Sequence, residues 1–149
     1  MAGKYFEDIE IGEEYTTAAR TITESDVMAF AGLSGDYNTL HTDAEFAKQT
    51  IFGQRIAHGL LGLAVSTGLK TRMNIFEGTV MAFLGLTWNF KGPIFFGDTV
   101  HAKVTIKEKR DTSKSDRGIM IQNLYLINQR GQVVQEGEHT IMLRRRPKE

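Results

Sequence analysis

An acidic side chain and an imidazole lie five residues apart in one short segment, as Asp36 and His41. The segment follows an expected helix, and Gly35 allows the tight backbone that ends such a helix. A carboxylate and an imidazole that contact one water molecule can move its protons, which typically contributes about 10²–10⁴ in rate. The same spacing also agrees with a structural role, in which Asp36 forms a turn and His41 flanks a helix.

A second candidate for chemistry is Gly59, near the start of a glycine-rich apolar stretch. We expect a helix from about 57 to 70, which places the Gly59 amide in its first turn. First-turn amides lack helical partners, and the helix dipole favours negative charge there. The amide could therefore stabilise a developing oxyanion. The alternative is that Gly59 serves only close packing against a sheet.

The remaining aromatic and ionisable residues carry weaker signals. We interpret His58 as a packing or capping residue, and Trp88 and Phe90 as core residues of a strand. The histidines show no metal-ligand spacing, and the chain has no cysteine. Neither a dinucleotide-binding glycine motif nor a P-loop occurs, so we expect no metal and no nucleotide cofactor.

These groups need a scaffold, and the first half of the chain reads as helices and loops. A capping-box pattern at 23–26 begins a helix that runs to about Leu33. Asp43 is expected to cap a second short helix that reaches Ala47. The helix expected over 57–70 is apolar on nearly all sides, which indicates that it is buried.

The second half of the chain alternates apolar and polar residues, as half-buried strands do. The expected strands lie near 80–91, 99–110, 117–128 and 132–143, with an earlier one near 14–21. Polar connections between them predict an antiparallel meander. The sequence thus predicts an α+β fold in which a curved antiparallel sheet wraps around one long central helix. We expect residues 1–149 to form a single domain.

Composition excludes several classes of function. Lysine plus arginine equals aspartate plus glutamate at 18 each, so the formal net charge is zero. A neutral chain gives no electrostatic reason to expect nucleic acid or an anionic membrane as partner. The first fourteen residues lack a signal-peptide pattern, and no apolar stretch is long enough to span a bilayer. We therefore expect a cytoplasmic protein, or one of an organelle matrix.

The segment from Ser34 to Ala47 resembles the signature of MaoC-like dehydratases and (R)-specific enoyl-CoA hydratases. That signature is typically Gly-Asp-x-Asn-Pro-x-His. The residues that match it in register are Gly35, Asp36, Asn38 and His41. The His58-Gly59 pair and residues 90–100 match as well, so the resemblance covers nearly the whole chain. Thr39 stands where the family usually has proline, which should loosen the loop without removing a chemical group.

The resemblance implies a hot-dog fold and the hydration of a trans-2-enoyl-CoA to a 3-hydroxyacyl-CoA, or the reverse dehydration. It implies that Asp36 and His41 hold the water, one removing its proton and one delivering a proton to C2. Gly59 would form the oxyanion hole, and Asn38 would support the loop. A supporting hydroxyl on the central helix would come from Thr67 or, alternatively, Ser66. Coenzyme A would enter only as part of the substrate, and the chain would form at least a homodimer.

Two other functions remain open at this point. A hot-dog acyl-CoA thioesterase also uses a carboxylate and a helix amide, but it hydrolyses the thioester. A non-catalytic acyl-CoA-binding subunit is the other alternative. Neither the length of the acyl chain, nor the choice between coenzyme A and acyl carrier protein, nor the direction of the reaction follows from the sequence.

Overall fold

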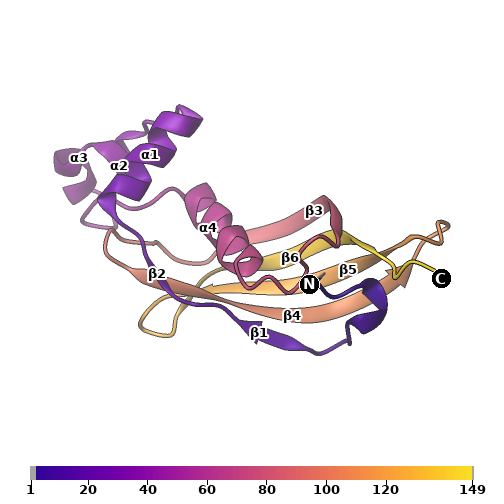
Figure 1. The fold of residues 1–149 in the computed structure, drawn as a ribbon. Helices are drawn as coiled ribbons and strands as arrows, with labels where there is room; N and C mark the ends of the chain where they lie inside the picture. The colour runs from indigo at the N-terminus through magenta and orange to yellow at the C-terminus, as the bar shows by residue number, and fades with distance from the viewer. Residues whose placement is uncertain (1–2, 149) are drawn as a thin grey trace.

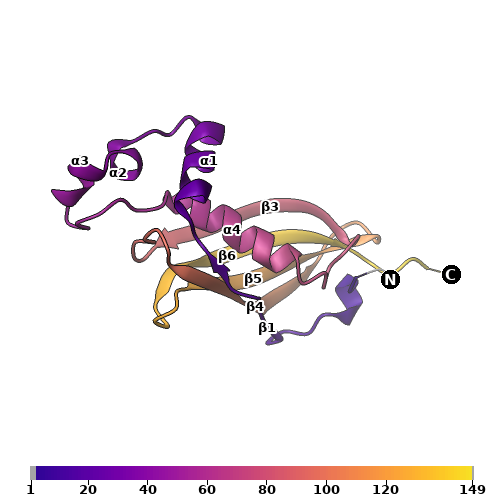
Figure 2. The same cartoon turned by 60° about the vertical axis from the view of Figure 1, so that its left-hand side comes forward.

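The computed structural model describes residues 3–148, which form one antiparallel sheet with a long helix across one face (Figures 1 and 2). The strands follow the order β1-β4-β5-β6-β3, and a short β2 also pairs with β4. Their bounds are β1 Glu14–Thr16, β2 Arg20–Thr21, β3 Val80–Phe90, β4 Thr99–Asp111, β5 Arg117–Ile127 and β6 Val133–Arg144. The four long strands lie within two residues of the predicted bounds, and the single early strand is replaced by two short ones.

The long helix α4, Gly59–Thr71, is the predicted central helix. It begins two residues later than expected because His58 has an extended backbone, with φ −57° and ψ 135°. Leu61, Val65 and Leu69 lie on its buried side and share one apolar cluster with residues of the sheet. The sheet residues of that cluster are Val100 of β4, Leu126 of β5 and Val134 of β6. Burial of these side chains fixes α4 on the sheet, at roughly 1.5–3 kcal/mol for each large one.

Three short helices gather at one end of the molecule, next to the start of α4 (Figure 2). They are α1 Glu24–Ser34, α2 Thr39–Thr42 and α3 Ala44–Lys48. The capping box predicted for α1 is present, with Thr23 accepting from the Asp26 amide. Asp43 caps α3 as predicted, whereas α2 was expected to be part of a loop. The loop between α1 and α2 is therefore bounded by a helix at each end.

A short 3₁₀ turn near the N-terminus, η1 Phe6–Asp8, lies beside β5 at the end of the sheet away from these three helices (Figure 1). In the described part of the chain, no helix combines the length and the apolar character needed to cross a membrane.

A charged group lies between the C-terminal end of α4 and the sheet. The Lys70 ammonium donates to Gln122 Oε1 at 2.9 Å and lies 3.2 Å from His139 Nδ1. His139 is fully buried, and burial next to Lys70 lowers its pKa to about 3. It is therefore a neutral acceptor for Lys70 at neutral pH. Burial lowers the pKa of Lys70 itself to about 8.

Replacing Lys70 by methionine should change how the free energy of unfolding depends on pH. The pKa of lysine is about 10.4 in an unfolded chain. Between pH 8 and 10 the unfolded chain therefore binds a proton that the folded chain has lost, so stability rises with pH in this window. From pH 7 to 10, urea unfolding should show wild type gaining about 1–3 kcal/mol relative to Lys70→Met. A parallel pH dependence of the two proteins would contradict the buried ammonium.

Candidate active site

The loop that carries Asp36 is held by hydrogen bonds within its own segment. Gly35 ends α1 with a left-handed backbone, φ 76°, and its amide donates to the Ala31 carbonyl at 2.9 Å. The Ser34 hydroxyl accepts from the Asp36 amide at 3.1 Å. The Asp36 carboxylate in turn accepts from the Asn38 amide at 3.2 Å. These bonds fix the backbone, while the Asp36 side chain remains exposed.

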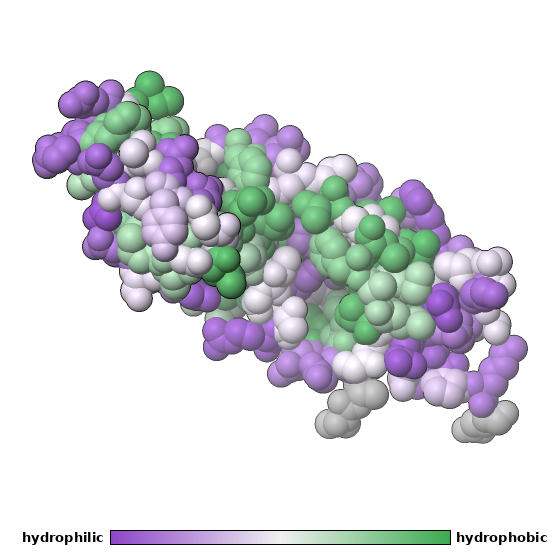
Figure 3. Space-filling view, turned by 90° about the horizontal axis from the view of Figure 1, so that it is seen from above, coloured by the Kyte–Doolittle hydropathy of each residue, from purple (hydrophilic) through white to green (hydrophobic). Residues whose placement is uncertain are grey.

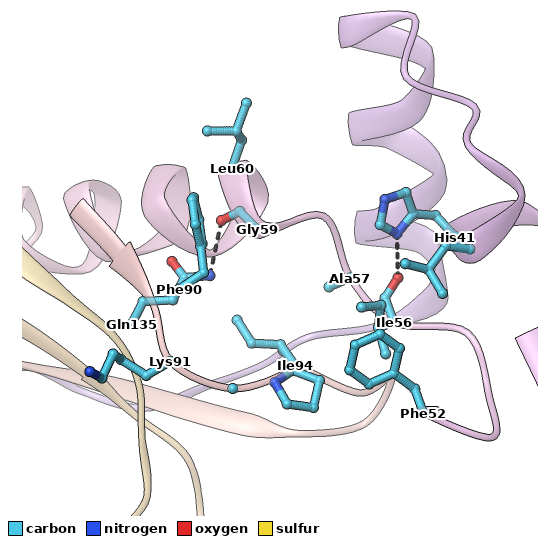
Figure 4. Close-up of a pocket in the computed structure, with 13 residues that line it drawn as sticks. His41, Phe52, Ile56, Ala57, Gly59, Leu60, Phe90, Lys91, Ile94 and Gln135 are labelled. Atoms are coloured by element: carbon cyan, nitrogen blue, oxygen red, sulfur yellow. Dashed lines mark hydrogen bonds between the residues drawn. The ribbon is translucent and has the colours of Figure 1, made fainter. Parts of the chain in front are cut away.

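His41 is buried and is held by the segment that precedes α4. Its Nδ1 lies 2.7 Å from the Ile56 carbonyl oxygen (Figure 4). Ile56 is itself anchored, since its amide donates to the Leu40 carbonyl and it forms an isolated bridge with Phe95. A carbonyl oxygen can only accept, so Nδ1 of His41 carries the ring proton. The lone pair of the neutral ring is therefore on Nε2.

His58 was interpreted as a packing or capping residue; it does pack, but against His41, which makes it part of the same cluster. It occupies the N-cap position of α4, but its side chain makes no cap hydrogen bond. Instead its ring stacks on His41, with centroids 3.8 Å apart and planes 28° apart. Its Nε2 lies 2.8 Å from the Asp36 carbonyl oxygen. His58 thus ties the Asp36 loop to the first turn of α4. The adjacency of His58 and Gly59 was the one sequence signal for this role.

The structure brings Asp36 and His41 together, as the sequence predicted. The carboxylate and one ring nitrogen each of His41 and His58 lie within 4.8 Å of one another. Three such donors could also hold a metal ion, although the sequence predicted none. The nearly parallel rings argue against this use, because imidazole lone pairs lie in the ring plane. An ion shared by two stacked rings would lie far out of both planes, and the absence of a resident metal stays a prediction.

Gly59 is the first residue of α4, and among residues 3–148 its amide has no hydrogen-bond acceptor. Its predicted position in the first turn is thus confirmed. A Cβ at this position would stand 2.7 Å from the Phe90 ring, so the glycine lets the aromatic side chain approach the helix. Gly59 therefore packs closely against Phe90 and also leaves its amide free, while its role as an oxyanion donor stays a prediction.

A pocket of about 750 Å³ begins at His41 and the first turn of α4. Its walls are mostly apolar; Figure 4 shows them coming from α4, the ends of β3 and β6, and the segments around 52–57 and 91–94. The lining residues are Leu40, His41, Phe52, Ile56, Ala57, Gly59, Leu60, Phe90, Lys91, Gly92, Pro93, Ile94 and Gln135. Phe90 is 56% exposed, so its interpretation as a core residue was wrong.

The predicted supporting residues divide into two groups. Asn38 caps α2, where its side chain accepts from the Leu40 amide at 3.0 Å. Thr39 is the first residue of α2, a position that favours proline because its amide lacks a helical partner. By contrast, the hydroxyls of Ser66 and Thr67 donate to carbonyls of their own helix, and neither residue lines the pocket. The structure therefore does not bring the expected helix hydroxyl to the site.

Comparison with known proteins agrees with this geometry. Residues 7–123 match the model of the MaoC like domain, so the chain belongs to the MaoC-like family. An (R)-specific enoyl-CoA hydratase from Rhodospirillum rubrum is 38% identical over 93% of this chain and 91% of that protein. A 3-hydroxybutyryl-CoA dehydratase from Methylorubrum extorquens is 42% identical over 70% of this chain and 64% of that protein.

The structural comparison supports the same family. A solved structure described as a monoamine oxidase regulatory protein from Archaeoglobus aligns with a TM-score of 0.93. It is 38% identical and covers 99% of this chain and 98% of its own. The sheet around α4 is the hot-dog architecture, so the predicted fold is confirmed. The predicted class, a lyase of the hydratase and dehydratase type, is confirmed by the relatives.

The stacked rings lead to a prediction about metals. We expect no intense ligand-field absorption when Co²⁺ is titrated into the protein, because the lone pairs of two nearly parallel stacked rings cannot both point at one ion. Absorption spectroscopy at equal concentrations of protein and Co²⁺ tests this, with His58→Phe as a comparison that keeps a ring beside His41. An intense tetrahedral Co²⁺ spectrum in wild type that disappears in this variant would establish a metal site.

Proposed function

We propose that the chain adds water to a trans-2-enoyl-CoA and forms an (R)-3-hydroxyacyl-CoA, or catalyses the reverse dehydration. The observation that carries this proposal is the Asp36 carboxylate within 4.8 Å of a ring nitrogen of His41, which stands at one end of an apolar pocket. The printed function of the Rhodospirillum rubrum relative supports the substrate and the stereochemistry.

The bond between His41 and Ile56 supports a division of roles. The Nε2 lone pair accepts a proton from water while the water oxygen bonds to C3. The C2=C3 electrons move toward the thioester, and negative charge collects on its oxygen. The resulting imidazolium then gives the proton to C2, which restores the thioester carbonyl. Asp36 holds the water and stabilises the imidazolium, so atoms and charges balance without another reactant.

The thioester oxygen would bind at the start of α4. The unpaired Gly59 amide favours the enolate more than the substrate, because the charge on the oxygen grows during the reaction. Losing one such donor typically costs about 10²–10³ in rate. The apolar walls of the pocket suit an acyl chain, and we propose no cofactor beyond the coenzyme A of the substrate.

Asp36→Asn and His41→Ala should each lower the rate of crotonyl-CoA hydration by at least about 10². Asparagine at 36 can still accept from the Asn38 amide, so the loop should be preserved. The loss of the alkene absorbance measures turnover, and circular dichroism checks that each variant folds. Asp43→Asn, which keeps a helix cap, and His101→Ala on β4 are matched controls that should retain wild-type rates.

The same assay separates the alternative functions. A thioesterase would release free thiol from crotonyl-CoA without prior hydration, which a thiol reagent detects. An acyl-CoA-binding subunit would turn over no enoyl-CoA. Near wild-type hydration by Asp36→Asn or His41→Ala would remove that residue from the mechanism. The predicted compartment, the cytoplasm or an organelle matrix, remains a proposal that cell fractionation would test.

We also propose that the protein is a homodimer that pairs through β3. Within residues 3–148 this eleven-residue strand pairs only with β6, so its other edge has no partner strand in that part of the chain. Its exposed apolar residues are Val80, Phe83, Leu84, Leu86 and Phe90. Figure 3 shows apolar surface gathered on the face that carries α4 and β3. A long apolar edge is prone to aggregation unless another chain covers it.

Sedimentation velocity at micromolar concentration should therefore show a dimer. Leu86→Asp should shift the protein toward monomer, because it places a charge on β3, the strand proposed to form the interface. Ile11→Asp is the matched control, since Ile11 is 65% exposed but lies outside β3. A wild-type monomer, or equal dissociation of both variants, would overturn the proposed interface.

A further inference from the structure

We propose that Gln135 is a positioning residue that holds and polarises the first turn of α4, and that Trp88 orients it. This inference rests on the proposed function, because it concerns the amides that would stabilise the thioester oxygen. Gln135 lies on β6 and lines the pocket beside Gly59. Its side chain is only 1% exposed, so its polar atoms need partners inside the protein.

Both ends of the Gln135 amide group are hydrogen bonded. Its Nε2 donates to the Gly59 carbonyl oxygen at 2.9 Å (Figure 4). Its Oε1 accepts from the Trp88 indole Nε1 at 3.0 Å. The indole nitrogen is a donor only, so this bond fixes which end of the Gln135 amide faces the helix. The result is a chain of donors that runs from β3 through β6 to the start of α4.

The helix is shaped to receive this side chain. A Cβ on Gly62 would stand 2.3 Å from Gln135 Nε2 and 2.7 Å from its Cδ. No substituent fits there unless Gln135 moves. Glycine in a helix costs about 1 kcal/mol relative to alanine. Gly62 therefore gives Gln135 room to reach Gly59, at some expense in helix stability.

The bond to the Gly59 carbonyl acts on the peptide that joins Gly59 to Leu60. The Leu60 N–H belongs to the same peptide plane and points the opposite way, so fixing the carbonyl fixes this donor. Neither the Gly59 nor the Leu60 amide has an acceptor among residues 3–148. A hydrogen bond to a peptide carbonyl also strengthens the N–H of that peptide as a donor. Gln135 thus orients and strengthens the Leu60 N–H, a second donor next to the Gly59 amide, without touching the reacting atoms.

Gln135→Met tests this inference, because methionine has a similar length and cannot donate to Gly59. We expect kcat for crotonyl-CoA hydration to fall about tenfold or more with little change in KM, as expected for a loss confined to the transition state. Trp88→Phe should show a smaller loss of the same kind. The double variant should lose less than the product of the two effects, because both residues act through one chain.

A matched control is Gln122→Met. Gln122 is also fully buried on the sheet, but it accepts from Lys70 at the far end of α4. It should lower thermal stability to a similar extent and leave kcat unchanged. Gly62→Ala provides the opposite probe, since it keeps every polar group but displaces Gln135, and it should reduce kcat as Gln135→Met does.

Infrared spectra of bound hexadienoyl-CoA labelled with ¹³C at the thioester carbonyl supply a readout besides the rate. The carbonyl frequency should be lowered less in Gln135→Met than in wild type. If wild type does not hydrate crotonyl-CoA, the proposed function fails. If wild type does so and Gln135→Met keeps both its kcat and the wild-type carbonyl frequency, Gln135 has only a structural role. Equal losses in Gln122→Met and Gln135→Met would also overturn the inference.

Discussion

Two hydrogen bonds from imidazole rings to backbone carbonyls hold the site together. His41 bonds the Ile56 carbonyl, and His58 bonds the Asp36 carbonyl, while the two rings stack on each other. The first bond joins α2, and the second joins the loop between α1 and α2, to the segment that leads into α4. Because a carbonyl only accepts, the bonds also set which ring nitrogen carries the proton. The positions of the two rings and the tautomer of each thus follow from the same contacts.

The start of α4 is the second element on which the arrangement depends. Its glycines weaken it as a helix, but they allow Phe90 to approach Gly59 and Gln135 to approach Gly62. Burial of Leu61, Val65 and Leu69 against the sheet offsets this weakness. The helix therefore has glycines where its backbone borders the pocket, and large apolar side chains where the sheet covers it.

Local patterns in the sequence predicted most of the fold. Of the candidate site, they predicted Asp36, His41 and Gly59. Alternation of apolar residues located the long strands, and the capping box and Asp43 located α1 and α3. The closeness of Asp36 and His41 followed from their short separation. His58 and Gln135 were not predicted as site residues, because their contacts with Asp36 and Gly59 join segments 22 and 76 residues apart. No periodicity or motif within one segment reports such a contact.

The position of Thr39 shows how the loop tolerates its departure from the family pattern. Thr39 begins α2, so its amide needs no helical acceptor and proline is not required for hydrogen bonding. Proline would only restrict the backbone. Here the restriction comes from side chains on either side: Asn38 caps α2, and the Thr42 hydroxyl donates toward the Tyr37 and Asn38 carbonyls at 3.1 Å. Local hydrogen bonds thus keep Asp36 and His41 close together, as the proposed addition of a water molecule by these two residues would require.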